Sequence, residues 1–322
     1  MLKKLALPLC RIAWRFPGAR LATPEVPIVL LYHEVPRSRP GGVEAKSFEE
    51  HVKFLQKNFE LVAPGDVGTR KSGRTRVMLT FDDGFKNNAE VVAPILKKER
   101  VPALFFISSR HCERGKYLWF HYLRGLERYF TGNGFNYQGE FWEMRPEKRR
   151  ETMARLWKHL VELKPHPAAM YEAIDQQLPK LGDFIPQSTL DDFFEGMTPE
   201  QVGELASDPL FTVGNHTHDH PYLTQCDLRV AEEQILRNKI WLEKHTGKPC
   251  DIISYPIGDY NQQILETSVK LGFHTGHAVQ PSIGKVPAME IERLGIYSAS
   301  TDLLGFKVTY GLFLRKLGLK LG

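Results

Sequence analysis

Residues 77–85 read Val-Met-Leu-Thr-Phe-Asp-Asp-Gly-Phe, an apolar run that ends in two carboxylates and a glycine. The run predicts a buried strand, and Gly84 predicts a sharp turn just after it. Two adjacent acids at a strand end are costly to hold unless a cation shares them. Side chains alternate along a strand, so we expect Asp82 and Asp83 to diverge, one toward a metal and one toward a substrate. The carboxyl ends of strands are where α/β sheets and barrels place their chemistry.

A second stretch, residues 212–221, reads Thr-Val-Gly-Asn-His-Thr-His-Asp-His-Pro and follows a short apolar run. His216 and His220 are four residues apart, a spacing that lets two imidazoles meet one ion. One carboxylate with two imidazoles leaves coordination positions open for water and substrate, as in catalytic metal sites. His218 is expected to point away from the ion, and Asp219 either orients a ligand or lies on the surface.

Together the two stretches, Thr-Phe-Asp-Asp-Gly followed by His-Thr-x-x-His, resemble the polysaccharide deacetylases, the NodB-homology or family-four carbohydrate esterases. The resemblance spans roughly residues 27–297 with a large insertion. It implies an α/β fold, a distorted (β/α)7 barrel, and a divalent metal. It also implies that Asp83, His216 and His220 are the metal ligands and that Asp82 is the base that takes the proton of water. Zinc suits imidazole ligands, and nickel, cobalt or iron also fit.

A third stretch, residues 254–261, reads Ser-Tyr-Pro-Ile-Gly-Asp-Tyr-Asn and resembles the family's Arg-x-Pro-Tyr-Gly loop. By position, the backbone amide of Ile257 helps to hold the oxyanion, and Tyr255 and Pro256 are predicted substrate contacts. The arginine that pairs with the base in the family is Ser254 here. Arg293, just before the last predicted strand, is the candidate substitute, and a surface ion pair is the competing interpretation.

The general acid needs a different argument, because this chain has no histidine after Tyr297 to match the family's C-terminal Leu-x-His motif. Leu31-Tyr32-His33 instead stands at the end of the first predicted strand. A circularly permuted arrangement, as in deacetylases of poly-N-acetylglucosamine, places this strand beside the last one and His33 over the metal. His33 is therefore the predicted acid; the alternatives are a histidine that merely ends a strand, or His274 or His277 as acid.

Strand and helix patterns alternate along most of the chain, which predicts the α/β class. Ser47 and Thr198 are the predicted N-caps of two of its helices, since each is followed three residues later by Glu or Gln. The alternation stops between about residues 113 and 197, where aromatic residues crowd the first part. We expect an insertion that packs as a cap over the barrel mouth. Its aromatic residues, among them Trp119 as a candidate substrate contact, either stack on sugar rings or a lipid chain, or form the insertion's own core.

The two ends of the chain are basic, at residues 1–24 and 301–322, although the whole chain carries a net charge of only +5. The body between them is acidic, which argues against a nucleic-acid groove. Apolar residues recur at helical spacing in both ends, which predicts either contact with an anionic membrane surface or packing on the barrel. The start lacks a signal-peptide pattern and no run could span a bilayer, so we expect a cytoplasmic protein, peripheral at the inner face of the membrane. Four scattered cysteines argue for a reducing compartment.

These observations favour a metal-dependent hydrolase that removes N-acetyl groups from an amino sugar of a glycan or a lipid-linked glycan. An O-acetyl esterase or an amidase acting on a non-sugar substrate would need the same metal site. A catalytically inactive carbohydrate-binding module is the third hypothesis, because Ser254 replaces the expected arginine.

Overall fold

Two parallel pairings of strand β1 (Ile28–Tyr32) close the main sheet into a barrel. β1 pairs with β10 (Ile291–Gly295) on one side and with β3 (Arg76–Phe81) on the other. The order around the barrel is β1-β10-β9-β8-β7-β4-β3, and the short β2 (Glu60–Leu61) joins β3. The remaining strands are β4 (Ala103–Ile107), β7 (Phe211–Asn215), β8 (Ile252–Ser254) and β9 (Thr275–Ala278). The computed structural model describes residues 26–39, 42–66, 73–280, 283–284 and 287–316, and within them the predicted (β/α)7 barrel is confirmed.

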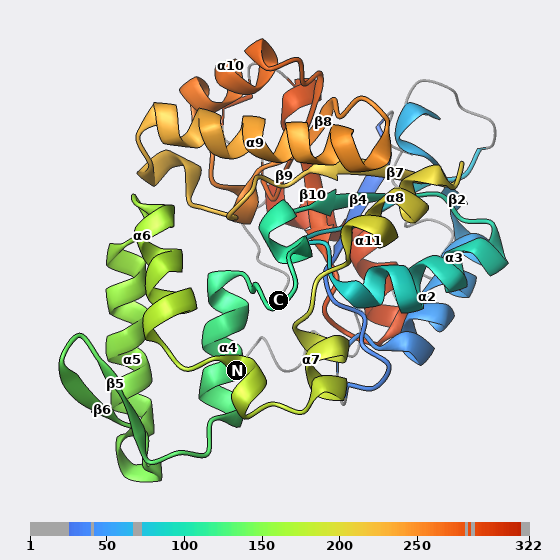
Figure 1. The fold of residues 1–322 in the computed structure, drawn as a ribbon. Coiled ribbons are helices and arrows are strands. Elements are labelled where there is room, and N and C mark those ends of the chain that lie inside the picture. Colours follow the sequence, from blue (N-terminus) through green and yellow to red (C-terminus); the bar gives the residue numbers. More distant parts are fainter. Residues whose placement is uncertain (1–25, 40–41, 67–72, 281–282, 285–286, 317–322) are drawn as a thin grey trace.

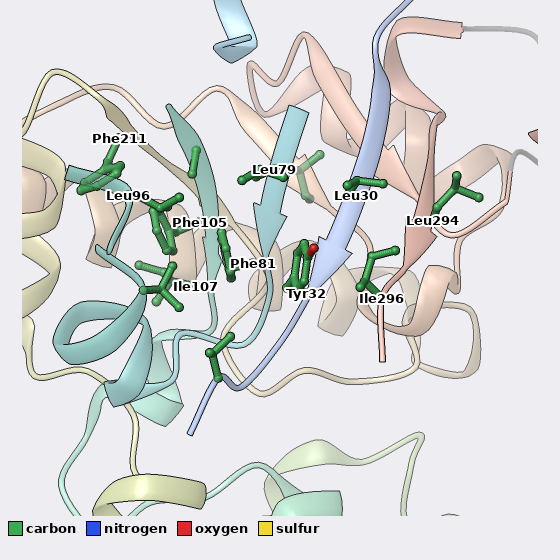
Figure 2. Packing of buried hydrophobic residues seen from close by; sticks show 14 of the residues in the cluster. Leu30, Tyr32, Leu79, Phe81, Leu96, Phe105, Ile107, Phe211, Leu294 and Ile296 are labelled. Carbon is green, nitrogen blue, oxygen red and sulfur yellow. The ribbon is translucent and has the colours of Figure 1, made fainter. Parts of the chain in front are cut away.

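The apolar runs of the strands explain why both faces of the barrel wall are covered. Every residue of β1, β3 and β4 is buried. Alternate side chains, such as Leu30, Leu79 and Phe105, join the cluster that includes the surrounding helices (Figure 2). The side chains of the intervening residues point into the barrel, where Val29 and Met78 belong to a separate small cluster. Polar side chains such as Asp82, Asp83 and His216 follow the carboxyl ends of these strands.

Helices surround this barrel on the outside (Figure 1). They are α2 (Ala45–Asn58), α3 (Ala93–Glu99), α8 (Pro199–Ser207), α9 (Leu228–Thr246), α10 (Gln262–Lys270) and α11 (Thr301–Lys316). The predicted cap at Thr198 is confirmed, because its side chain accepts from the Gln201 amide. The start of α2 differs: Glu44 is the cap residue, and Ser47, expected to be the cap, lies inside the helix and accepts from the Glu44 amide. Either residue suits a helix start, so sequence alone did not separate them.

The expected insertion separates β4 from its neighbour in the sheet, β7, and stands to one side of the barrel (Figure 1). It holds a two-stranded hairpin and four helices among the described residues: α4 (Trp119–Tyr129), β5 (Gly134–Tyr137), β6 (Glu140–Glu143), α5 (Pro146–Glu162), α6 (Pro167–Glu172) and α7 (Gln187–Phe193). Most of its aromatic residues, including Tyr122, Phe135 and Trp142, are buried in one cluster separate from that of the barrel. Of the two interpretations of these aromatics, the structure favours the insertion's own core.

The two basic ends have different outcomes. Residues 1–24 lie outside the described part of the chain, so the N-terminal prediction is not tested. At the other end, α11 packs against α2 and β10, and Leu304 and Val308 are buried in the barrel's core cluster. The first turns of α11 therefore pack on the barrel, as one of the two interpretations predicted. Residues 317–322 lie outside the described part of the chain. No helix in the described residues has the length and apolar character needed to cross a membrane.

Candidate active site

The barrel brings the predicted site residues together because parallel strands end at the same rim. His33 follows β1, Asp82 and Asp83 follow β3, and His216 follows β7. The register places the ends of β1 and β3 side by side, since Tyr32 pairs with Phe81 and the Asp82 amide donates to the Tyr32 carbonyl. The rim therefore joins residues that lie far apart in the sequence.

Asp83, His216 and His220 form the one cluster of three potential metal ligands found among the described residues, with donor atoms within 4.8 Å of one another. Asp83 Oδ1 lies 3.6 Å from His216 Nε2 and 3.5 Å from His220 Nε2. All three side chains are buried. No hydrogen bond from a described residue reaches either carboxylate oxygen of Asp83. A buried carboxylate without donors is costly, so this arrangement fits a bound cation.

The protonation states of the two imidazoles suit the same role. His216 Nδ1 lies 2.9 Å from the carbonyl oxygen of Ser254, which can only accept, so Nδ1 donates and Nε2 keeps its lone pair toward Asp83. Burial lowers the pKa of His216 to about 4, and burial lowers the pKa of His220 well below its ordinary value. Burial and the neighbouring Asp82 charge raise the pKa of Asp83. A cation would stabilise the ionised carboxylate, so one carboxylate and two neutral imidazoles fit zinc or a similar divalent metal.

The expectation that Asp82 and Asp83 diverge is wrong. β3 ends at Phe81, and Asp83 adopts a left-handed backbone with φ of 74° before Gly84 at 79°. The turn brings both carboxylates to His216, whose Nε2 is 3.6 Å from Asp82 Oδ2 and 3.6 Å from Asp83 Oδ1. Strand alternation does not apply once the chain has left the strand.

Asp82 is held by Arg293, as the sequence analysis suggested. Arg293 Nη1 and Nη2 lie 2.7 and 2.8 Å from the two carboxylate oxygens of Asp82, and Nη2 donates at 2.6 Å to Ser254 Oγ. Arg293 is 1% exposed, so the surface ion pair is excluded. Burial alone would raise the pKa of Asp82, but the Arg293 guanidinium more than offsets it and holds that pKa well below its usual range.

His33 lies where the permuted arrangement predicts it, at the end of β1 and beside β10. The Ile296 amide donates to the Leu31 carbonyl, which sets His33 against Tyr297 with ring centroids 6.0 Å apart. His33, Asp83 and Tyr297 line a pocket with a volume of about 290 Å³. Burial lowers the pKa of His33, and the Asp82 and Glu34 carboxylates oppose that shift. The half-buried His33 thus lines the same pocket as Asp83, the candidate metal ligand.

Backbone strain gathers in the loops of this site. Besides Asp83, the non-glycine residues with positive φ include Thr217 at 61°, His220 at 52° and Ile257 at 61°. Such conformations cost on the order of 1–3 kcal/mol each and persist where the surrounding structure imposes them. Ile257 is β-branched, so its left-handed backbone is especially unfavourable. It lies just after β8, where the sequence analysis placed the oxyanion-binding amide.

The three predicted substrate contacts are not at this pocket. Tyr255 is fully buried and stacks on Tyr260 with ring centroids 4.6 Å apart, and Pro256 is buried beside it. Trp119 is 2% exposed and belongs to the insertion's own core. A buried side chain cannot contact a sugar in this conformation, and we propose no substrate contact through these residues.

Other histidines near the motif have structural partners. His218 Nδ1 lies 2.7 Å from Ser109 Oγ, in line with the expectation that it points away. Asp219 is buried and accepts from Gln234 Nε2 at 2.8 Å, so its expected surface position is wrong. His274 is exposed and pairs with Asp251, and His277 is buried on β9, so neither lines the pocket as His33 does.

Two histidines that the sequence analysis did not consider hold Asp83 from the insertion side. His121 on α4 is buried and lines the pocket, with Nε2 3.6 Å from Asp83 Oδ2. His111 Nδ1 lies 3.0 Å from the main-chain carbonyl of Asp83, where the backbone is left-handed. The ring of Phe85 packs against both, and the two imidazole rings lie 5.4 Å apart between centroids. No motif marks either histidine, because their position depends on how the insertion folds back on the rim.

Comparison with known proteins agrees with the fold and the motifs. The sequence pattern of the polysaccharide deacetylase family matches residues 69–276. The Bacillus subtilis (strain 168) protein YxkH is 21% identical over 259 residues, which cover 79% of this chain and 64% of YxkH. The chain therefore spans less than two thirds of that relative's length.

Solved structures share the fold at low sequence identity. IcaB from Ammonifex degensii has a TM-score of 0.55 at 17% identity, covering 89% of this chain and 98% of its own. The Streptococcus pyogenes deacetylase PplD has a TM-score of 0.53 at 17% identity, covering 87% and 98%.

His33 and Arg293 lie outside the matched residues 69–276, so their assignment depends on the geometry described above. The family match includes Asp82, Asp83, His216 and His220. With the family pattern covering more than half of the sequence, the chain belongs to the polysaccharide deacetylase family.

Proposed function

We propose that the chain is a metal-dependent hydrolase that removes N-acetyl groups from an amino sugar of a glycan or of a lipid-linked glycan. The observation that carries the proposal is the buried Asp83 carboxylate, which has no donor among the described residues and faces two neutral imidazoles. An arginine-paired second carboxylate and an open pocket lie beside it. This is the equipment that amide hydrolysis by activated water requires.

Asp83, His216 and His220 would hold a divalent cation, which would acidify a water molecule and polarise the acetamide carbonyl. Asp82 accepts the proton of the attacking water, and Arg293 keeps that carboxylate ionised. The Ile257 amide is the proposed donor to the oxyanion. The water oxygen bonds to the carbonyl carbon, the C–N bond breaks, and His33 delivers a proton to the leaving nitrogen. That proton is balanced by the one that Asp82 takes from water. Acetate and a free amine leave.

The test is acetate release by the purified protein, with bound metal quantified in each sample. N-acetylglucosamine oligomers, O-acetylated sugars and a lipid-linked glycan extract serve as substrates. Asp82→Asn and His33→Ala should retain metal and lose about a hundredfold or more of the rate. His274→Ala, a change at an exposed histidine outside the site, should have no effect.

Each other outcome identifies which part of the proposal is wrong. Release from O-acetylated sugars alone would favour the esterase. A protein that purifies without stoichiometric metal and releases nothing would favour the binding module. A fully active His33→Ala variant would refute the assignment of the acid.

A further inference from the structure

The pocket lining includes two arginines that contact one carboxylate. Arg39 follows β1, and Arg124 lies on helix α4 of the insertion. Their Nη1 atoms lie 2.6 and 3.0 Å from the same oxygen, Oε1 of Glu34. All three residues line the pocket that also holds His33 and Asp83. The barrel and the insertion therefore meet in a charged cluster next to the reacting groups.

This cluster carries two positive charges and one negative charge, and its two arginine side chains are more exposed to solvent than its glutamate. The Glu34 side chain is 9% exposed, whereas those of Arg39 and Arg124 are 41% and 47% exposed. Each guanidinium has five N–H donors in a rigid fork, and one of them is directed at Glu34. The buried carboxylate thus contacts two partly exposed arginine side chains, each of which has further N–H donors beyond the one at Glu34. Such forks match the geometry of carboxylate and phosphate oxygens.

An aromatic surface completes the pocket. Tyr297 is 61% exposed although it lies beside buried β10, and its ring stacks on His33. An exposed ring of this kind offers an apolar face to a pyranose ring. A sugar placed on Tyr297 would have the proposed acid on one side and the two arginines at the outer wall.

We propose that Arg39 and Arg124 form a subsite for an oxyanion, a carboxylate or a phosphate, carried by the N-acetylated sugar or by the unit next to it. The proposal rests on the proposed function, because it takes this pocket to be the substrate site. The substrate class is then an acidic or phosphorylated N-acetylated glycan rather than a neutral one. A purely structural ion-pair cluster between barrel and insertion is the competing account.

The test compares sugars that differ only in the anion: N-acetylglucosamine, its 1-phosphate, its 6-phosphate and its uronic acid. Acetate release gives kcat/KM for each, and equilibrium titration of the full-length, metal-loaded protein gives Kd. At least one anionic sugar should exceed the neutral one by about tenfold or more, as charge-assisted hydrogen bonds allow. The phosphate and uronate arms separate the two kinds of anion. The advantage should shrink as salt rises from low to high ionic strength.

Variants separate a subsite from a structural cluster. Arg39→Gln and Arg124→Gln should each lower the ratio of anionic to neutral kcat/KM by about tenfold, the loss expected for one charge-assisted contact. Arg128→Gln is the matched control, because Arg128 is exposed on the same helix and does not line the pocket. Equal losses on anionic and neutral sugars would overturn the proposal, as would the absence of any anionic preference in the wild type.

Failure of the proposed function can be told apart from failure of the subsite. If no sugar releases acetate, the hydrolase is refuted, and the Kd values still decide the subsite. Tighter binding of an anionic sugar that both arginine variants abolish supports it. Equal Kd values for neutral and anionic sugars refute it even if acetate is released.

Discussion

Arg293 and Ser254 together explain how this chain keeps a base-arginine pair without the family's arginine. The guanidinium comes from β10 instead of the last residue of β8, and Ser254 at that position is small enough to accept from it at 2.6 Å. The sequence showed the gap at Ser254 and a nearby candidate, but not the bidentate geometry. Pairing across the barrel depends on which side chains point inward from strands distant in sequence.

Replacing Arg293 tests this relocated pair. Arg293→Ser leaves Asp82 buried without its partner, so kcat/KM should fall by about a hundredfold or more and the free energy of unfolding by roughly 3 kcal/mol. Adding Ser254→Arg restores a guanidinium at the family's position, so the double variant should recover about tenfold or more of the activity. Acetate release and urea unfolding measure both effects, with metal content checked in each variant. A double variant no better than Arg293→Ser would contradict the exchange of roles.

A buried histidine away from the metal predicts how stability depends on pH. His51 on α2 is 0% exposed and lies 3.2 Å from the Tyr32 hydroxyl, and burial lowers its pKa to about 4. Between pH 6.5 and 4 the unfolded chain binds more protons at this site, so its contribution to stability falls as the pH falls. From pH 7 to 4.5, the contribution of His51 to the free energy of unfolding should fall by about 2–3 kcal/mol.

The matched variant isolates this contribution. His51→Gln does not titrate, so its unfolding free energy should fall less than that of the wild type over the same range. Urea unfolding of both proteins at pH 7 and pH 4.5, after chelator treatment, gives the difference. Parallel decreases in the two proteins would show that His51 does not cause the loss.

At the scale of elements, helix α4 is the part of the insertion that reaches the site. It carries Phe120, His121 and Arg124 into the pocket wall, and Phe120 packs on the metal-ligand candidate His220 with ring centroids 5.0 Å apart. Tyr171 of α6 adds a second contact, since its hydroxyl donates at 2.8 Å to the Asp219 carbonyl in the ligand loop. The insertion stands to one side of the barrel, and through α4 and α6 it contacts the candidate metal site.

His121 tests that bracing. Its Nε2 faces Asp83 Oδ2 and leaves Oδ1 toward the imidazoles of the ligand set. Groups that orient a metal ligand typically change metal affinity by 10–100-fold, so His121→Ala should weaken metal binding by about tenfold. Competition with a coloured chelator measures the affinity without any substrate. His166→Ala, at an exposed histidine of the same insertion, is the control. If the His121→Ala variant binds metal as tightly as the wild type, His121 contributes only packing and does not orient Asp83.

Local patterns predicted elements better than they predicted the positions within them. The strand before Asp82 and the cap at Thr198 followed from residue order alone, because both signals are local. The start of α2 shifted to Glu44, since two polar residues competed for one cap. The convergence of Asp82 and Asp83 was missed, because it depends on a left-handed Asp83 held by His111.

At the scale of the whole molecule, closure of the barrel is what turns separate motifs into one site. β1 fills the place between β10 and β3, and this placement alone brings His33 and Arg293 to the rim beside Asp82. The permuted order could be expected from Leu31-Tyr32-His33 and the missing C-terminal histidine. His121 and Arg124 could not, since no sequence signal shows where an insertion packs, and Arg39 lies in a loop without a motif.

A cation held by Asp83, His216 and His220 would connect the ends of two strands of this barrel, so its removal should lower the stability of the entire chain. Asp83 and the two histidines come from β3 and β7 ends that β4 separates in the sheet. A ligand that binds only the folded state stabilises by about 2.7 kcal/mol at a hundredfold excess over its Kd. Chelator treatment should therefore lower Tm by several degrees, and added zinc should restore it. The paired variant His216→Ala with His220→Ala should show no response to chelator or zinc, because two of three ligands are gone. The wild-type Tm could instead stay unchanged after chelator treatment that is shown to have removed the metal. This result would mean that the buried Asp83 is stabilised in some other way.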